Sequence, residues 1–168
     1  IVQIVVPDDI YDEPKILARV NIQYPDTNYS SYSSLVGIEY RGGISQYYPK
    51  RSYGFTLLNS MDLEDTASHR LIGRERNTQW ILDAMYVDNA RLRNKLSFAL
   101  WFSIPGVEQD HGIHPEHVEL FINHRHQGLY AFSEMLNSCK LGLTSPDGVL
   151  YKSYSWADGA TTFHTTNQ

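Results

Sequence analysis

Apolar side chains alternate with small or polar ones in several short stretches of this chain. Between residues 16 and 24 every second position is apolar, and the apolar members are Ile16, Ala18, Val20, Ile22 and Tyr24. A period of two is typical of a half-buried β-strand. The run 1–6 is apolar and β-branched and stops at a Pro-Asp-Asp turn, which favours an opening strand. We therefore predict strands over residues 1–6 and 16–24.

The stretch 36–58 predicts a β-hairpin. Residues 37–41 and 52–57 both alternate bulky side chains with small or polar ones, as half-buried strands do. A Gly-Gly pair at 42–43 interrupts the first run where the backbone needs conformational freedom. Pro49 restricts the backbone just before the second run. We expect this hairpin to be the central element of the fold.

A helical period follows further along the chain. Within residues 89–102 apolar residues recur at the spacing i, i+4, i+7 and i+8, namely Leu92, Leu96, Ala99 and Leu100. This spacing predicts the longest amphipathic helix of the chain. Asp88 or Asn89 can cap its first turn, because a short polar side chain accepts a bond from a free backbone N–H. The helix should end before Pro105.

The remaining segments predict a second hairpin and loops. Residues 117–123 and 127–134 are expected to pair across a turn at 124–126, and 149–152 to form one more short strand. The polar stretch 59–77 predicts a long loop with one short helical turn, and 154–168 has no periodic pattern. Together these elements predict an α+β fold with an antiparallel sheet and one main amphipathic helix. At 168 residues the chain suits a single domain, 1–168.

Charge and composition narrow the possible partners. The formal net charge of -5 argues against a general nucleic-acid binder, whose surface would be basic. The sequence has no apolar run long enough to cross a bilayer, so we expect no membrane span. The single cysteine, Cys139, excludes an internal disulfide. The chain opens at Ile1 without a methionine, so we expect a removed leader or a piece of a longer protein, and a sequon at Asn28 hints at export.

Lys50 and Arg51 stand at the start of the second strand of the central hairpin. One interpretation is that they are solvated cations which protect an edge strand. The other is a phosphate clamp, because a lysine ammonium suits phosphate oxygens and a neighbouring Gly-Gly turn lets the backbone approach a ligand. The spacing of these residues does not decide between the two.

Three blocks of sequence together are more specific than any one of them. The first combines 40–45 (YRGGIS) with 49–53 (PKRSY), the second 80–84 (WILDA) with 88–96 (DNARLRNKL), and the third 118–123 (VELFIN) with 128–134 (GLYAFSE). In content and order they resemble the conserved blocks of the CotH kinase family, the atypical protein kinases related to spore coat protein H. The resemblance implies that residues 1–168 form the N-terminal, nucleotide-binding lobe of a longer kinase domain.

The resemblance also implies a set of nucleotide contacts. It places Lys50 against the phosphates of ATP with Arg51 beside it, and Glu134 near the adenine and ribose. Lys152 matches a recurrent basic position of the family only loosely. The implied cofactors are ATP and Mg²⁺, and the implied partner is a substrate or neighbour protein of a coat or extracellular assembly. We therefore expect an extracellular or cell-surface location.

Arg41 has two possible roles at such a site. Its planar fork suits a bidentate pair with a carboxylate, such as Asp88 or Glu134, or a direct contact with phosphate. Asp88, Arg93 and Asn94 match the second block, but a helix cap with local hydrogen bonds explains them equally well.

The residues that complete phosphoryl transfer are missing from these blocks. The reaction needs carboxylates that hold Mg²⁺ and a residue that positions the acceptor hydroxyl. In the resembled family these lie downstream of the third block, and Asp147 and Asp158 do not match them. We therefore expect the chain to be the ATP-binding lobe of a CotH-like Ser/Thr kinase for secreted or coat proteins, with contact to ATP rather than turnover. The alternative is a non-catalytic structural or protein-binding module that kept the lobe.

The histidines offer a third hypothesis. His111, His114 and His117 recur at every third position, and His124 and His126 lie on the following turn. Imidazoles gathered in this way would suit Zn²⁺ or a similar ion, as in a metal hydrolase. Loop histidines are otherwise ordinary, and no cysteine or paired carboxylate stands near them in the sequence.

Overall fold

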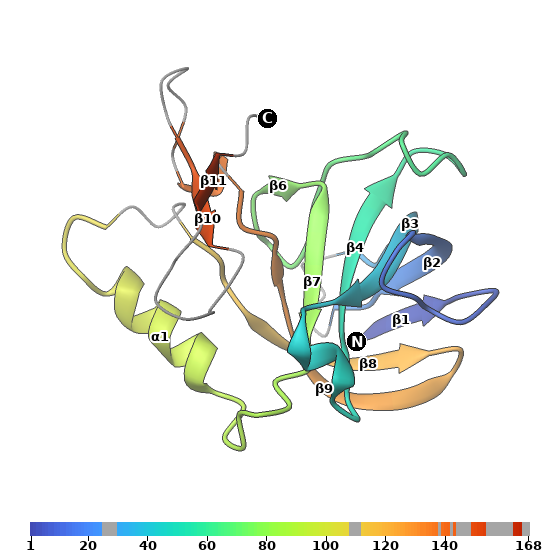
Figure 1. Ribbon diagram of the computed structural model, residues 1–168, viewed down its shortest axis with the longest axis horizontal. Coiled ribbons are helices and arrows are strands. Elements are labelled where there is room, and N and C mark those ends of the chain that lie inside the picture. The colour runs from blue at the N-terminus through green and yellow to red at the C-terminus, as the bar shows by residue number, and fades with distance from the viewer. Residues whose placement is uncertain are drawn as a thin grey trace.

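The computed structural model describes residues 1–24, 30–107, 112–137, 139–141, 143, 149–153 and 163–165. Within this part of the chain seven strands close into a β-barrel (Figure 1). Around the barrel the order is β1 (Val2–Val5), β2 (Ile16–Ile22), β3 (Tyr32–Arg41), β4 (Ser52–Leu58), β7 (Gln79–Asp83), β9 (Arg125–Glu134) and β8 (Glu116–Ile122). Neighbouring strands are antiparallel except β1 and β8, which are parallel.

Short elements lie outside the barrel wall. They are the 3-10 turns η1 (Ile44–Tyr47) and η2 (Cys139–Leu141), the pair β5 (His69–Arg70) and β6 (Arg76–Asn77), the helix α1 (Arg93–Phe102), and the pair β10 (Tyr151–Ser153) and β11 (Phe163–Thr165). The predicted loop 59–77 thus contains a short strand pair, and no helix forms within it. Most of the stretch 154–168 lies outside the described residues.

The predicted α+β fold with a kinase-like lobe is wrong. The strands were largely placed correctly, but they form a closed barrel rather than an open antiparallel sheet. Closure comes from the parallel pairing of β1 with β8, in which Val2 lies beside Leu120 and Ile4 beside Ile122. A closed barrel has no edge strands, so the edge-strand interpretation of Lys50 does not apply.

Aromatic side chains fill the barrel. Phe55, Trp80, Tyr130 and Phe132 are each at most 1% exposed. The ring of Phe132 lies 5.9 Å from that of Phe55 and 5.3 Å from that of Trp80. In a barrel of this size inward-facing side chains occupy the interior, so the core is complete without a covering helix.

Helix α1 is present, but its apolar stripe is not buried. It begins at Arg93, later than predicted, and none of its residues is buried. Leu92, Leu96 and Leu100 are 53%, 58% and 60% exposed. The helix contacts the rest of the molecule through its other side, where the rings of Phe102 and His114 stack 4.3 Å apart. The amphipathic pattern therefore predicted the helix and not the partner of its apolar side.

Two turns show why their residues are required. Gly42 has a φ of +108°, which strains any residue with a side chain, and a Cβ there would also force Ser45 Oγ, 2.0 Å away, to move. Asn123 and His124 have φ of 47° and 65°, as both central residues of a type I′ hairpin turn do. The second hairpin is therefore tighter than predicted, with β9 starting at Arg125.

The part of the chain that the structure describes contains no helix that is long and apolar enough to span a membrane.

Candidate functional site

Lys50 leads into β4 and lies against the barrel wall. Its Nζ donates hydrogen bonds to Ala84 O, at 3.2 Å, and to Leu129 O. The same atom lies 4.1 Å from the centre of the Tyr130 ring. The residue Ala84 directly follows β7, and Leu129 and Tyr130 belong to β9, which neighbours β7 in the barrel. The barrel thus gathers groups that are distant in sequence around one ammonium.

In these surroundings Lys50 loses its proton at a lower pH than an exposed lysine does. Burial lowers the pKa of Lys50, and the positive charge of Arg91 lowers it further. The carboxylates of Asp83 and Glu119 act in the opposite direction, and the resulting pKa is about 8. At neutral pH the side chain is therefore still charged. Among the described residues Lys50 has no carboxylate partner within ion-pair distance.

A cleft of about 210 Å³, which we call the Asp83 cleft, opens beside Lys50. Its lining includes Tyr48, Lys50, Ser52, Asp83, Arg93 and Asn94. The rings of Tyr48 and Tyr86 stack at its rim with their centres 5.0 Å apart. The cleft therefore combines aromatic faces with two cations and with the carboxylates of Asp83 and Asp88. The rings and cations suit a ligand that carries both a ring and an anionic group.

Hydrogen bonds of Asp83 make the floor of this cleft rigid. Its Oδ1 accepts from Ser52 Oγ at 3.2 Å and from the Met85 N–H at 3.0 Å. Its Oδ2 accepts from Asn94 Nδ2 at 3.3 Å. Ser52 Oγ in turn accepts the Ala84 N–H at 2.9 Å. The carboxylate thus ties the ends of β4 and β7 to the first turn of α1.

A larger hollow of about 650 Å³, which we call the tyrosine cleft, also borders Lys50. Its lining includes Tyr40, Tyr47, Tyr48, Arg51, His126 and Tyr130. The Arg51 guanidinium lies 4.5 Å from the centre of the Tyr40 ring, and Arg51 O accepts a hydrogen bond from Tyr130 Oη at 3.1 Å. Lys50 therefore stands between two hollows, and Arg51 lines only the larger one.

Glu134 lies at the other end of the same strands. It pairs with Trp80 across the sheet, whereas Ala131 pairs with Asp83 beside the cleft. Its carboxylate is fully buried and contacts Lys140 Nζ at 3.3 Å and the His114 N–H at 3.2 Å. The structure therefore places Glu134 in a buried ion pair with Lys140, away from Lys50.

The expected partners of Arg41 are engaged elsewhere. Arg41 is exposed at the end of β3, opposite Ser52. Asp88 accepts the backbone N–H of Arg93 at 2.8 Å and forms an ion pair with its side chain at 3.5 Å. The backbone hydrogen bond from Arg93 holds the pKa of Asp88 below its usual value. Lys152 belongs to β10, and its side chain lies outside the described residues.

The described histidines of this group each have a different partner. His117 Nε2 bonds Arg91 O at 2.7 Å, and His126 Nε2 bonds the Glu119 carboxylate. His114 stacks on Phe102, and His111 lies outside the described residues. Across the described part of the chain no three His, Cys, Asp or Glu side chains are arranged to hold an ion.

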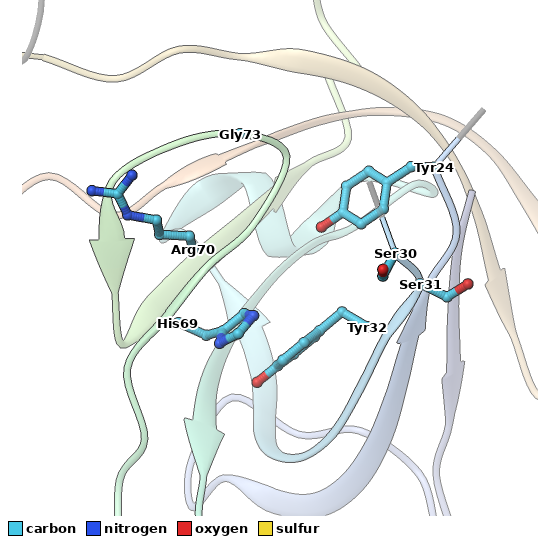
Figure 2. A pocket seen from close by; sticks show the side chains of 7 residues that line it. All are labelled: Tyr24, Ser30, Ser31, Tyr32, His69, Arg70 and Gly73. Atoms are coloured by element: carbon cyan, nitrogen blue, oxygen red, sulfur yellow. The ribbon is translucent and has the colours of Figure 1, made fainter. Parts of the chain in front are cut away.

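A separate hollow of about 660 Å³ lies at the far end of β3 (Figure 2). The rings of Tyr24, Tyr32 and His69 border it, and the last two stack 4.2 Å apart. Arg70 points away from these rings and pairs with Glu75 at 3.1 Å. Tyr32 begins and Arg41 ends the 10-residue strand β3, so this hollow is roughly 30 Å from the Lys50 end of the barrel.

Sequence reasoning singled out Lys50 but missed Ser52, Asp83 and Arg91 as its neighbours. All three stand in the blocks described above, in the strings PKRSY, WILDA and DNARLRNKL. Ser52 and Arg91 lie inside the predicted strand 52–57 and the predicted helix 89–102, so the local pattern did not mark them as site residues. The pairing of β4 with β7 brings Ser52 to Asp83, and Arg91 reaches the end of β7 from the segment between β7 and α1.

Comparison with known proteins supports the resemblance of the three blocks. The family model described as CotH kinase protein matches residues 38–165, which is most of the chain. No curated protein matches the sequence. The match begins in β3, within the central hairpin, and covers Lys50 and every residue named above for the Asp83 cleft. The chain therefore belongs to the CotH kinase family.

Proposed function

We propose that this chain binds ATP at Lys50 and serves as the nucleotide-binding part of a Ser/Thr protein kinase for secreted or coat proteins. The observation that carries the proposal is a half-buried, charged lysine between two hollows, within the segment that matches the family. Among the described residues its ammonium contacts two backbone carbonyls and the face of Tyr130. Phosphate oxygens are stronger acceptors for an ammonium than neutral carbonyls.

What these residues contribute to phosphoryl transfer is positioning and charge. The transferred group needs little covalent help from the protein, so catalysis rests on holding the phosphates and neutralising their charge. Lys50 supplies a compact cation, and the rigid floor around Asp83 keeps the end of β4 in place for it. Exposed Arg51 and Arg41 border the same end of the barrel and would meet the outer part of the ligand.

Mg²⁺ is the other cofactor that the family implies. It is usually held by one or two carboxylates together with the phosphates of the substrate. Asp83 and Asp88 line the Asp83 cleft, but their oxygens already accept hydrogen bonds from Ser52, Asn94 and backbone N–H groups. These bonds hold both carboxylates in place without using all of their lone pairs, and we derive no step through the ion.

The second candidate is a non-catalytic module that binds another protein of an extracellular assembly. Apolar side chains exposed on and beside α1 favour this second candidate. Those about half exposed or more are Leu92, Leu96, Leu100, Trp101 and Ile104. Contiguous apolar surface of this kind is characteristic of protein interaction sites. The stripe and the Lys50 site lie on different residues, so the two candidates can be tested separately.

The test is calorimetric titration of the chain with ATP, with and without Mg²⁺. We expect saturable binding that is lost or strongly weakened by Lys50→Met, a change that keeps the apolar stem against Tyr130 and removes the charge. Arg19→Gln is the matched control, because Arg19 is an exposed cation on β2. Absence of ATP binding by the unaltered chain, or equal binding by Lys50→Met, would overturn the proposal and leave the protein-binding module.

A further inference from the structure

Arg91 and Lys50 converge on a single backbone carbonyl. Arg91 stands between β7 and α1, and its Nη1 donates to Ala84 O at 3.4 Å. Lys50 Nζ donates to the same oxygen at 3.2 Å. Two cations thus share one neutral acceptor.

The backbone holds Arg91 firmly in this position. Its N–H donates to Asp88 O at 2.9 Å, and its carbonyl oxygen bonds His117 Nε2 at 2.7 Å. Its φ is +55°, a conformation that costs a non-glycine residue on the order of 1 kcal/mol or more and persists only where the surroundings impose it. Strained positions of this kind cluster at ligand sites.

The pair of cations is not neutralised by a contact. Among the described residues no carboxylate lies within ion-pair distance of Arg91 or Lys50. The carboxylates whose charge acts on Lys50 are Asp83, whose oxygens accept from Ser52, Met85 and Asn94, and Glu119, which bonds His126. The repulsion from Arg91 also contributes to the lowered pKa of Lys50. The two cations therefore lie close together, and the carboxylates that act on Lys50 do so without an ion-pair contact.

We propose that Arg91 and Lys50 together clamp the phosphate chain of a nucleoside triphosphate, which displaces Ala84 O as their common acceptor. A guanidinium offers a planar fork for two phosphate oxygens, and the ammonium beside it supplies a compact charge. The nucleotide as ligand rests on the function proposed above. The assignment of Arg91 rests on the carbonyl that it shares with Lys50 and on the absence of an ion-pair contact to either cation among the described residues.

Binding of ATP and of inorganic tripolyphosphate, which has no base or sugar, tests the clamp. Charge-assisted hydrogen bonds contribute about 1.5–3 kcal/mol, so Arg91→Gln should weaken both ligands by about tenfold to a hundredfold. Arg91→Lys keeps the charge without the planar fork, so its affinity for both ligands should lie between those of Arg91→Gln and of the unaltered chain. Arg19→Gln should bind both ligands as the unaltered chain does. Far-UV circular dichroism establishes that each variant is folded.

A second readout needs no ligand. NMR titration of the Lys50 side chain in the free protein should show its pKa rising from about 8 when Arg91→Gln removes the neighbouring cation. Unchanged binding of both ligands by Arg91→Gln, while Lys50→Met loses them, would overturn the clamp and leave the proposed function standing. Binding of tripolyphosphate without binding of ATP would overturn the nucleotide function and leave the clamp. A Lys50 pKa that does not respond to Arg91→Gln would contradict the pairing itself.

Discussion

Asn123 joins β8 to β1, the two strands whose pairing closes the barrel, so its replacement should destabilise the whole fold. Its Oδ1 accepts the Val6 N–H at 2.9 Å, and its Nδ2 donates to Val6 O at 3.1 Å. Its own N–H donates to Ile4 O at 2.9 Å. The side chain thereby extends the parallel pairing of β1 with β8 by one residue beyond the strands. The same residue closes the β8–β9 hairpin with a φ of 47°.

The structure sets the size of the effect for Asn123→Ala. Two hydrogen bonds are lost, each contributing about 1 kcal/mol. Alanine lacks the local polar contacts that make the left-handed conformation tolerable for asparagine, which adds about 1 kcal/mol. We expect a loss near 3 kcal/mol, or a Tm lower by roughly 6–12 °C for a chain of this size. Asn123→Asp keeps the acceptor for the Val6 N–H and should lose less.

Urea unfolding followed by circular dichroism measures the difference. His124→Ala is the matched control, because His124 is the other positive-φ residue of the turn and is exposed. Its cost should stay within about 1 kcal/mol, because only the left-handed backbone preference changes and no hydrogen bond to Val6 is lost. If Asn123→Ala destabilises the protein no more than His124→Ala, the side chain does not hold the barrel closed and the reasoning fails.

Two further predictions concern charged groups away from Lys50. Lys140→Met leaves the carboxylate of Glu134 buried without its cation. It should lower the free energy of unfolding, measured by thermal unfolding, by about 3–5 kcal/mol. A loss below about 1 kcal/mol would show that the ion pair does not matter to the fold. Burial opposes ionisation of Glu116, but the hydrogen bond from Lys95 and the charges of Lys95 and Arg74 together lower its pKa below 4.5. Because the folded pKa is the lower one, this group stabilises the fold above about pH 4.5 and the contribution is lost as the pH falls through the folded pKa. Glu116→Gln should therefore flatten the decline of unfolding free energy below pH 4.5, and an unchanged decline would contradict the ion-pair assignment.

The sequence by itself determined the local elements and the family. Strands β2 and β4 lie close to where a period of two places them, because side-chain alternation depends only on neighbours in the chain. Strand β3 begins at Tyr32, well before the predicted run 37–41. The turn at Gly42 follows from local sterics in the same way. The three blocks identified the CotH kinase family, which the match over residues 38–165 confirms. Lys50 was singled out on the same grounds.

Only the tertiary structure decided how these elements close and what they bring together. The parallel pairing of β1 with β8 joins segments far apart in the chain, and no local pattern encodes that choice. An open sheet would have needed α1 as a cover, whereas the closed barrel fills itself and leaves the stripe of α1 exposed. The neighbours of Lys50 at the end of β7 and on β9 follow from strand register. Lys140 and Arg91 reach Glu134 and Ala84 O from segments outside the strands. Register is set by packing around the whole barrel, so these contacts become visible only once every strand has its neighbours.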